Sequence, residues 1–352
     1  MSDAPSPETR IDPVAGRVPE SRLGWNEANN ELAAWGSTPA APVCGMPWIG
    51  QLPCTAGRLS NGLATDRQWV ASHFTSLLIR GFCDLGVVSE ALAGEGVFPV
   101  GALPAGATAA KAMATIWLNI IHDSVCGTYH EVVLSFDVNH EKAGTIAFTA
   151  GGLVGATWAM QYGNFGPSVC ESQFLHSLWI NSPLSITWGR EMQAFPKHPK
   201  PVASTLTDDA EAFAFSLSWD GQNVMRGRAA KRFGAVPFLR EGLGLVAANG
   251  LFGVLGFLGR PAFDVPITMP RQTAEQNGVG RRYLGHLWKG LNPMGVQVWP
   301  WGEGDTIELG MIEEPSGCEE HNGHALLRRA GFAPVSVTYL ARAAAVVEAV
   351  GG

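Results

Sequence analysis

The sequence predicts a mainly β protein of the α+β class, with one large antiparallel sheet system and few helices. Segments rich in β-branched and aromatic residues recur along the chain and stop at Gly, Pro, Asn or Asp. The 352 residues include 43 glycines and 23 prolines, so turns are frequent. No internal repeat is visible. We therefore expect a sheet that is closed on itself or sandwiched.

The strongest strand signals lie in the middle of the chain. Two β-rich runs, at 114–122 and 131–138, flank the turn-like segment DSVCGTY. Runs at 174–180 and 184–188 predict two further strands joined by a tight Asn-Ser-Pro connection. Alternating apolar and polar residues on both sides of Asp220-Gly221 predict a β-hairpin.

Three other segments give weaker predictions. The run from Asp66 to Leu92 predicts helix or mixed structure with an apolar stripe. The runs GVQVWPW and DTIELGMI bracket Gly302–Gly304 and predict a second hairpin. The C-terminal VSVTYLARAAAVVEAV predicts a strand that passes into a helix.

Composition excludes several classes of protein. The apolar fraction of 46% and the charged fraction of 16% exclude a disordered chain. A formal net charge of −7 argues against a nucleic-acid-binding protein, which needs a basic surface. The uncharged stretch 242–259 contains six glycines, so we expect it inside the protein or lining a loop and not in a membrane.

The N-terminal region and the cysteines indicate the compartment. The N-terminus lacks a basic region followed by an apolar run, so we predict a cytoplasmic protein without a signal peptide. We expect reduced, structurally buried thiols at the six scattered cysteines, which are Cys44, Cys54, Cys83, Cys126, Cys170 and Cys318. Residues 1–62, rich in Pro, Gly and Ala, predict an arm or extension that precedes one domain at 63–352.

Lysine is scarce, and its distribution suggests chemistry. The chain has six lysines against 18 arginines, and two of the six fall in GREMQAFPKHPKP at 189–201. A lysine with an ordinary pKa of about 10.4 is protonated at pH 7 and cannot attack a carbonyl. Burial disfavours the ammonium form and can lower the pKa by about 3–5 units. On composition alone, solvated surface lysines in a Pro-rich loop remain the plainer interpretation.

Three blocks of sequence resemble the acetoacetate decarboxylase family, in the family's order. HDSVCGTYHE at 122–131 is similar to its H-D…G-x-Y-x-E segment. FLHSLWINSPLSITWGREMQAFPK at 174–197 resembles, without gaps, the segment that leads into its G-R-E-x-x-x-[FY]-P-K signature. The 213–233 hairpin, RRYLGHLWKG, WPWGEGDTIEL and APVSVTYLARAAAVV are looser matches, and the likeness covers roughly 65–345.

The resemblance implies a cone-like or barrel-like antiparallel β fold that encloses a hydrophobic cavity. It implies that Lys197 forms a Schiff base with a keto substrate, because acetoacetate decarboxylase is itself a known case of a lysine activated by desolvation or by a neighbouring cation. It places Glu131 near the imine, where a carboxylate positions substrate or transfers protons. Tyr129 belongs to the same motif, and we expect it to contact substrate. Arg190, with Glu191, is expected to hold the lysine loop through a salt bridge, with direct substrate contact as the other interpretation.

The sequence departs from the family pattern at three places. His198 stands where the family usually has a second lysine, and we expect it to tune Lys197 or transfer protons. The stretch from Gly96 to His122 contains no Asp or Glu, and Trp117 falls near the position of the family's other acid. Arg67 is a weak match to the family's N-terminal arginine.

Bulky aromatic residues surround the signature. They predict a larger and more apolar substrate than acetoacetate, with Trp117 and Phe195 as substrate contacts, although core packing explains most of them. These aromatic residues are Trp158, Phe165, Trp179, Trp188 and Phe195.

Other constellations are weaker. CEEHNGH at 318–324 matches no zinc spacing and predicts a solvated loop, and His122-Asp123 sit next to each other on a strand and so point to opposite faces. No serine elbow, phosphate-binding loop or dinucleotide motif occurs, so we expect neither a cofactor nor a metal.

The leading hypothesis is a Schiff-base-forming lyase that decarboxylates a hydrophobic β-keto acid. Its partner is therefore a small carbonyl compound, with no nucleic acid and no membrane, and the family resemblance adds a homo-oligomer. One alternative keeps the imine but performs aldol condensation, dehydration or cyclisation. Another is a non-covalent binding protein with a vestigial lysine.

Overall fold

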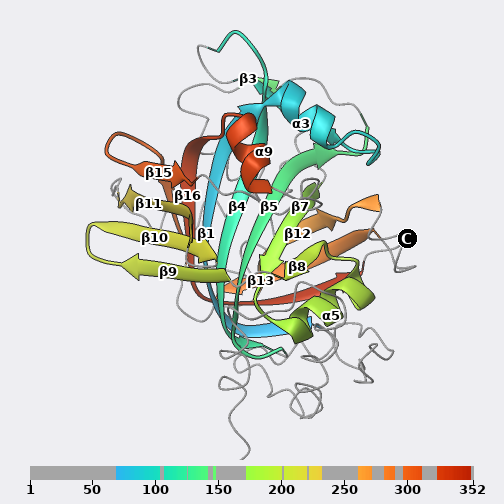
Figure 1. Ribbon diagram of the computed structural model, residues 1–352, viewed down its shortest axis with the longest axis vertical. Coiled ribbons are helices and arrows are strands. Elements are labelled where there is room, and N and C mark those ends of the chain that lie inside the picture. The colour runs from blue at the N-terminus through green and yellow to red at the C-terminus, as the bar shows by residue number, and fades with distance from the viewer. Residues whose placement is uncertain are drawn as a thin grey trace, which may run out of the picture.

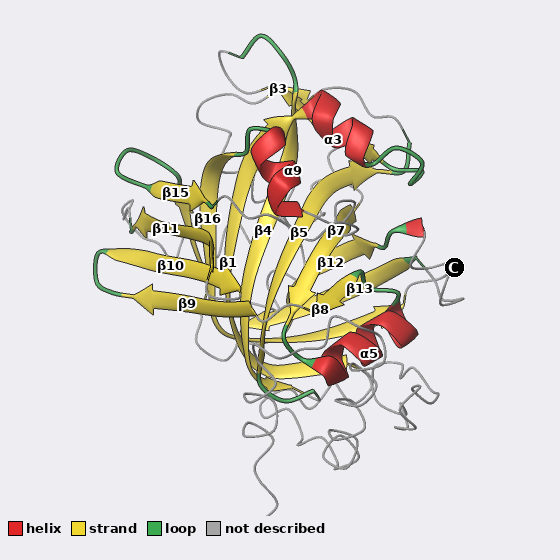
Figure 2. Ribbon diagram, in the orientation of Figure 1, coloured by secondary structure: helices red, strands yellow, loops and turns green. Residues whose placement is uncertain are grey.

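Strands dominate the part of the chain that the structure describes (Figures 1 and 2). In this computed structural model the described residues are 69–103, 107–124, 126–141, 146–147, 172–199, 202–219, 222–231, 261–271, 281–289, 296–310 and 323–349. They include the helices Leu85–Ala91 (α3), Pro183–Gln193 (α5) and Gly323–Arg329 (α9).

A sheet of 12 strands forms the body of the molecule. Its strands are β1 Trp69–Asp84, β2 Phe98–Pro99, β3 Gly101–Leu103, β4 Lys111–Ser124, β5 Tyr129–Asn139, β6 Ile146–Ala147, β7 Ser172–Ile180, β8 Lys197–Pro199, β12 Pro261–Thr268, β13 Arg282–Lys289, β14 Val296–Pro300 and β16 Ala333–Ala349. They follow the order β2-β5-β7-β12-β13-β16-β1-β4-β3-β6, with β14 beside β16 and β8 beside β7. Most pairs are antiparallel, as the sequence predicts.

The large sheet is coiled on itself. Strand β4 pairs with β1 on one side and with β5 on the other, so the strand path returns to its start. Irregular register in β1 on both sides of Phe74 bends the strand, as β-bulges do. The weakest contact in this path is between β7 and β12. These two strands are parallel, and only two residue pairs of their described parts lie opposite each other. Over the described residues, the sheet therefore surrounds an interior without being a continuously hydrogen-bonded barrel.

A second sheet of four strands packs on the outer face of the first. It consists of β9 Val202–Asp208, β10 Ala212–Trp219, β11 Gln222–Ala230 and β15 Thr306–Leu309 in the order β15-β11-β10-β9. Phe213 of β10 packs against Tyr339 of β16, with 4.6 Å between ring centroids. His130 of β5 links the two sheets, because its Nδ1 accepts a hydrogen bond from the backbone N–H of Ser204 at 2.9 Å.

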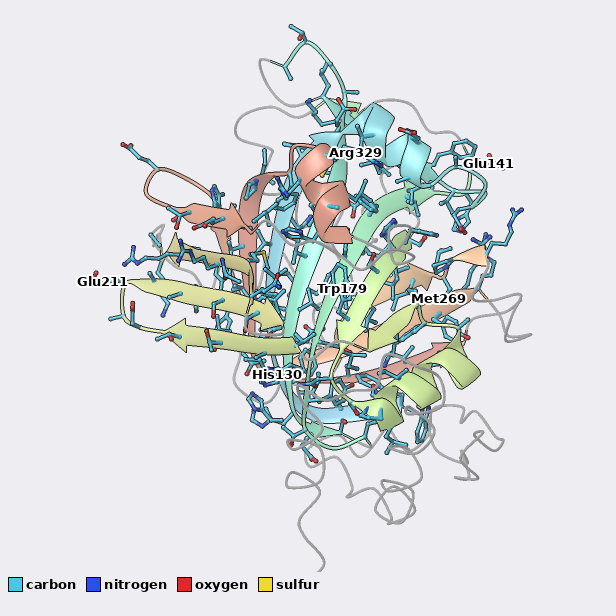
Figure 3. The ribbon with its side chains drawn as sticks, viewed as in Figure 1. His130, Glu141, Trp179, Glu211, Met269 and Arg329 are labelled. Carbon is cyan, nitrogen blue, oxygen red and sulfur yellow. The ribbon has the colours of Figure 1, made fainter. Side chains whose placement is uncertain are left out.

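The large sheet has apolar side chains on both faces, which explains why its strands look continuously hydrophobic. Along β5, Val132 and Leu134 belong to the outer core, whereas Val133 belongs to the inner core. The outer core also contains Trp179, which lies centrally in Figure 3, while the exposed Glu211 lies at the periphery. The inner core lines the space in which the candidate site lies.

Several sequence predictions are confirmed. The runs at 114–122, 131–138 and 174–180 are the centres of β4, β5 and β7. The predicted hairpin is present, since β10 and β11 pair in antiparallel fashion with Ala212 opposite Ala230.

Three predictions are wrong in type or pairing, and a fourth is confirmed only in one of its alternatives. Residues 184–188 are not a strand but part of α5, because Ser182 caps this helix and Pro183 occupies its first turn. For 66–92, the mixed-structure alternative is confirmed from Trp69 onward, because β1 runs to Asp84 and α3 follows at Leu85–Ala91, whereas helix throughout is wrong. The C-terminal segment continues as strand to Ala349, paired with β1 and β13. The strands beside Gly302–Gly304 do not pair with each other, since β14 pairs with β16 and β15 with β11.

Some predictions fall outside the described residues, among them the arm at 1–62 and the Gly-rich stretch 242–259. Within the described part, no helix has the length and apolar character needed to span a membrane. The homo-oligomer stays a prediction.

Candidate functional site

The candidate lysine is delivered by a sharp connection between α5 and β8. The helix begins where the Ser182 hydroxyl accepts a hydrogen bond from the Ser185 N–H at 3.2 Å, and it ends at Ala194, whose φ of 54° is left-handed. The chain then turns at Pro196, where the Lys197 N–H donates to the Phe195 carbonyl at 2.7 Å. Lys197 is therefore the first residue of β8, where it pairs with Leu178 of β7, and its side chain lines the interior that the sheet surrounds.

The Lys197 side chain is buried, with 1% of its surface exposed. Its Nζ donates a hydrogen bond to the Ser185 hydroxyl at 2.8 Å and lies 5.5 Å from the centroid of the Phe195 ring. Burial lowers the pKa of Lys197 below its ordinary value, and the negative charge of Glu131 opposes this only in part. The amine is therefore closer to its nucleophilic neutral form than an ordinary lysine is.

Gly189 makes room for the lysine. A Cβ atom at this position of α5 would lie 2.5 Å from Lys197 Cε and 2.6 Å from Cδ, well inside van der Waals contact. Ser185 and Gly189 are four residues apart and so lie on the same face of the helix. That face supplies both the hydrogen-bond acceptor and the space for the lysine side chain, which gives the glycine of the GRE segment a physical reason.

Glu131 is held by a chain of hydrogen bonds across the sheet. Asn119 of β4 lies opposite Glu131 of β5 and donates from Nδ2 to Glu131 Oε1 at 2.9 Å. Ser76 of β1 donates in turn to Asn119 Oδ1 at 2.6 Å. Glu131 is only 8% exposed. Its carboxylate is thus fixed in the interior, close enough to Lys197 to act on its pKa.

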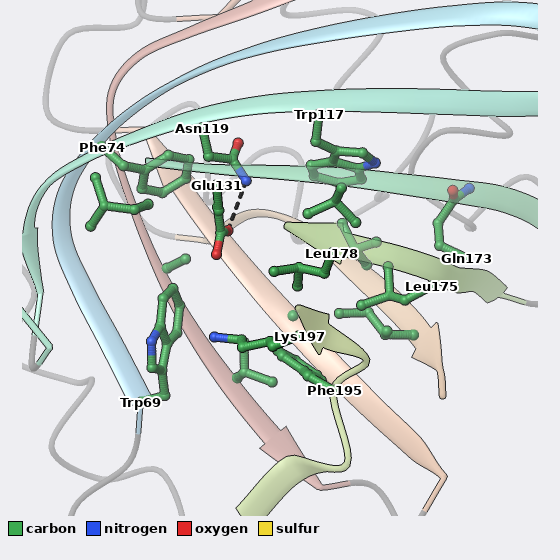
Figure 4. A pocket seen from close by; sticks show the side chains of 17 residues that line it. Trp69, Phe74, Trp117, Asn119, Glu131, Gln173, Leu175, Leu178, Phe195 and Lys197 are labelled. Atoms are coloured by element: carbon green, nitrogen blue, oxygen red, sulfur yellow. Dashed lines mark hydrogen bonds between the residues drawn. The ribbon is translucent and has the colours of Figure 1, made fainter. Parts of the chain in front are cut away.

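These side chains face an apolar cavity of about 100 Å³ (Figure 4). Because a cavity of about 10–15 Å³ already holds one water molecule, this space accommodates a small organic molecule. Lys197 and Glu131 are its two charged wall residues within the described part of the chain, and they point into the same end of it. The described wall residues are Trp69, Phe74, Trp117, Asn119, Ile121, Glu131, Val133, Gln173, Leu175, Leu178, Phe195, Lys197, Val265, Ile267, Gly285, Ala345 and Val347.

A second polar group lies along the interior beyond the apolar walls. Gln173 lines the cavity, accepts a hydrogen bond from Ser135 at 2.8 Å and donates one to Asp137. Asp137 also forms an ion pair with Arg80, and neither side chain of that pair is exposed. Trp117 completes the group by donating from Nε1 to Ser135 at 3.0 Å. These bonds fix the orientation of two polar wall residues, Trp117 and Gln173.

The sequence-predicted residues are distributed as follows. Lys197, Glu131, Trp117 and Phe195 line the cavity together. Tyr129 does not line it but is buried next to it, with Oη beside the side chains of Ser185 and Trp69.

The backbones of Arg190 and His198 lie in α5 and β8, but their side chains are outside what the structure describes. Arg67, Trp158 and Phe165 are also outside the described residues.

Ser185, Gly189 and Asn119 contact the site but were not predicted from the sequence. The first two follow from α5: had Ser182-Pro183 been read as a helix start, the i,i+4 spacing would have placed them on one face. Asn119 gave no signal of its own, because only the β4–β5 register brings it opposite Glu131.

The weaker constellations lie elsewhere. Of the predicted loop at 318–324, residues 318–322 lie outside the described residues. Gly323 and His324 belong to α9, where the His324 side chain is buried. His122 Nε2 lies 3.0 Å from the Thr75 hydroxyl, and its ring is tilted by 36° against that of His73; neither histidine is among the described wall residues of the cavity. Across the described ranges, no three His, Cys, Asp or Glu side chains form a group that could hold a metal ion.

The buried cysteines Cys83 and Cys126 form no disulfide. Burial raises the pKa of both thiols to about 12, and the charge of Lys197 and a contact with Ser185 act against this at Cys126. Cys126 is therefore a neutral thiol close to the lysine.

No protein-family model and no curated protein sequence matches the chain. Among solved structures, it is similar to an acetoacetate decarboxylase from Legionella pneumophila subsp. pneumophila str. Philadelphia 1, with 11% identity, a TM-score of 0.46, and coverage of 80% of this chain and 87% of that chain. It is similar to a chain from structural studies of acetoacetate decarboxylase, with 12% identity, a TM-score of 0.43, and coverage of 80% and 89%. It is also similar to the enduracididine biosynthesis enzyme MppR complexed with pyruvate, with 12% identity, a TM-score of 0.39, and coverage of 84% and 96%.

Proposed function

We propose that the protein is a Schiff-base-forming lyase that decarboxylates a hydrophobic β-keto acid at Lys197. The observation that carries this proposal is a buried lysine whose Nζ points into an apolar cavity and whose pKa is lowered by desolvation. A neutral amine in a dry pocket is the nucleophile that imine chemistry requires.

The reaction begins with attack of the neutral Nζ on the keto carbon, which forms a carbinolamine. Loss of water gives a protonated imine. The bond between the α-carbon and the carboxylate then breaks, carbon dioxide leaves, and the electron pair moves into the iminium to form an enamine. Protonation of the α-carbon and hydrolysis of the imine release the ketone and return the amine.

Glu131 is the side chain placed to handle protons or to position substrate. Its carboxylate faces the same end of the cavity as Nζ and is held by Asn119. A substrate carboxylate brought close to it is repelled, whereas carbon dioxide, the product, is not. Placing Glu131 beside the reacting carbon therefore favours loss of the charged group.

The walls of the cavity indicate the substrate class. Most of them are aliphatic or aromatic side chains, with Trp69, Phe74 and Trp117 among the largest. Such walls favour a substrate with an apolar chain or ring, because burying apolar surface contributes about 25 cal/mol per Å².

A second candidate keeps the imine but changes the later steps to aldol condensation, dehydration or cyclisation. Two observations favour it: Asn119, a neutral amide, lies beside Glu131, and no described arginine lines the cavity to hold a carboxylate. Carbon dioxide release from a panel of β-keto acids separates the two, since this candidate forms the imine and releases none.

The proposal is tested by borohydride reduction in the presence of β-keto acids and enals, followed by peptide mass mapping. We expect one reduced adduct on Lys197, its loss in Lys197→Met, and its retention in the matched control Lys111→Met. An adduct on another lysine would refute the site. An unchanged protein mass, with activity retained in Lys197→Ala, would instead support a non-covalent binding protein.

A further inference from the structure

Two buried hydrogen-bond donors near the lysine make no hydrogen bond of good geometry among the described residues, although Tyr129 Oη lies close to the side chains of Ser185 and Trp69. They are the indole Nε1 of Trp69 and the hydroxyl Oη of Tyr129. Trp69 is 8% exposed and Tyr129 is 2% exposed, so bulk water does not satisfy them. Buried polar groups are normally paired, and an exception in a functional region points to a ligand atom.

Both donors belong to the neighbourhood of the reactive amine. Tyr129 lies two residues before Glu131 on β5, so both side chains point to the inner face of the sheet. Its Oη lies beside the side chains of Ser185 and Trp69, and Ser185 accepts the hydrogen bond from Lys197 Nζ. Trp69 lines the cavity at the end into which Nζ points (Figure 4).

The Tyr129 hydroxyl is also kept protonated. Burial and the negative charge of Glu131 raise its pKa well above its ordinary value. Tyr129 and Trp69 are therefore neutral donors, suited to hold an oxygen atom that carries lone pairs and little or no net charge.

We propose that Tyr129 Oη and Trp69 Nε1 bind the oxygen atom that leaves and re-enters at the imine carbon. This inference rests on the proposed imine chemistry. The carbinolamine hydroxyl takes up a proton and leaves as water, and the C–O bond breaks as the C=N bond forms. In the last step the same site holds the water whose oxygen adds to the imine carbon, and one of its protons returns to nitrogen.

Ser185 completes this oxygen site, which consists of Tyr129, Trp69 and Ser185. Its hydroxyl accepts from Nζ and can donate to the departing oxygen, so it connects the two atoms between which a proton must move. The site gives the buried tyrosine a role that does not require contact with the body of the substrate.

The test measures exchange of ¹⁸O from labelled water into a ketone product, which requires the carbinolamine and the imine but not decarboxylation. We expect Tyr129→Phe and Trp69→Phe each to slow exchange by at least about tenfold, as loss of a donor to a reacting oxygen does. Tyr283→Phe removes another buried tyrosine hydroxyl, near Phe195, and should exchange at the wild-type rate. Thermal unfolding of each variant shows whether it is folded, and the two donor variants provide independent tests.

Wild-type exchange in both donor variants would overturn the oxygen site while leaving the imine chemistry intact. Equal slowing in Tyr283→Phe would also overturn it, because the effect would then come from core packing. If wild-type protein shows neither exchange nor a borohydride adduct, the proposed function fails and the oxygen site falls with it.

Discussion

Substituting Gly189 with alanine tests whether α5 positions the lysine. The added Cβ would lie 2.5 Å from Lys197 Cε and 3.0 Å from Nζ. Carbon atoms in contact normally stay about 3.5–4.0 Å apart, so the end of the lysine must move by about 1 Å. The flexible lysine end moves more easily than the helix backbone does. The amine would then lose its place beside Ser185.

The expected result separates activity from stability. A displacement of about 1 Å at a reacting atom can cost roughly 10²-fold in rate. Alanine is favoured over glycine in a helix interior by about 1 kcal/mol, which offsets part of the steric cost. We therefore expect imine formation to fall about 100-fold while the free energy of unfolding changes by no more than about 1 kcal/mol.

The assay is the rate of borohydride-trapped adduct formation, followed by intact mass, with urea unfolding in parallel. Gly86→Ala in α3 is the matched control, because that glycine is exposed and its added Cβ meets only Asp84 Oδ1, at 3.2 Å. If Gly189→Ala traps substrate at the wild-type rate, the lysine does not depend on the space beside Gly189, and our account of the site is wrong.

Three further predictions concern buried ionisable groups. Burial lowers the pKa of Lys197 from its ordinary 10.5, so between its native pKa and 10.5 the unfolded state binds more protons and stability rises with pH. Lys197→Met should therefore be most stabilising at the acidic end, and a stability difference in urea unfolding that stays constant from acidic pH up to 10.5 would contradict this. The thiol pKa of Cys83 and of Cys126 is raised to about 12, so both should resist iodoacetamide at about pH 8 until the protein unfolds. Peptide mapping measures this labelling, and rapid labelling of the native protein would argue against the burial of the two thiols. Asp137→Leu leaves the Arg80 charge buried without its partner and should destabilise the protein by about 3–5 kcal/mol in urea unfolding, whereas a cost below about 1 kcal/mol would mean that water reaches the pair.

Local sequence signals were sufficient for the strands whose pattern comes from their own residues. The central runs of β4, β5 and β7 are rich in β-branched and aromatic side chains, and the β10–β11 hairpin carries Asp-Gly at its turn. Propensity and turn chemistry act over a few residues, so these elements could be predicted without knowledge of the fold.

Pairing partners overrode the local signal at the C-terminus. The alanine-rich end of β16 favours helix by intrinsic propensity, but β1 and β13 flank it and satisfy its backbone as a strand. The partners are far away in the sequence, so no local pattern announces them. The error at α5 differs in kind, because Ser182 and Pro183 did carry a helix-start signal.

The sequence by itself predicted Lys197 and Glu131 as candidate site residues, through the resemblance to a family signature, and the apolar character of their surroundings, because a motif and a composition are properties of the chain. Only the tertiary structure placed Ser185 and Gly189 against the lysine, set Asn119 opposite the glutamate, and left two buried donors beside them. The burial of the Lys197 amine and its contacts depend on elements that are distant in sequence and meet only when the sheet coils. The lowered pKa of Lys197 follows from that burial.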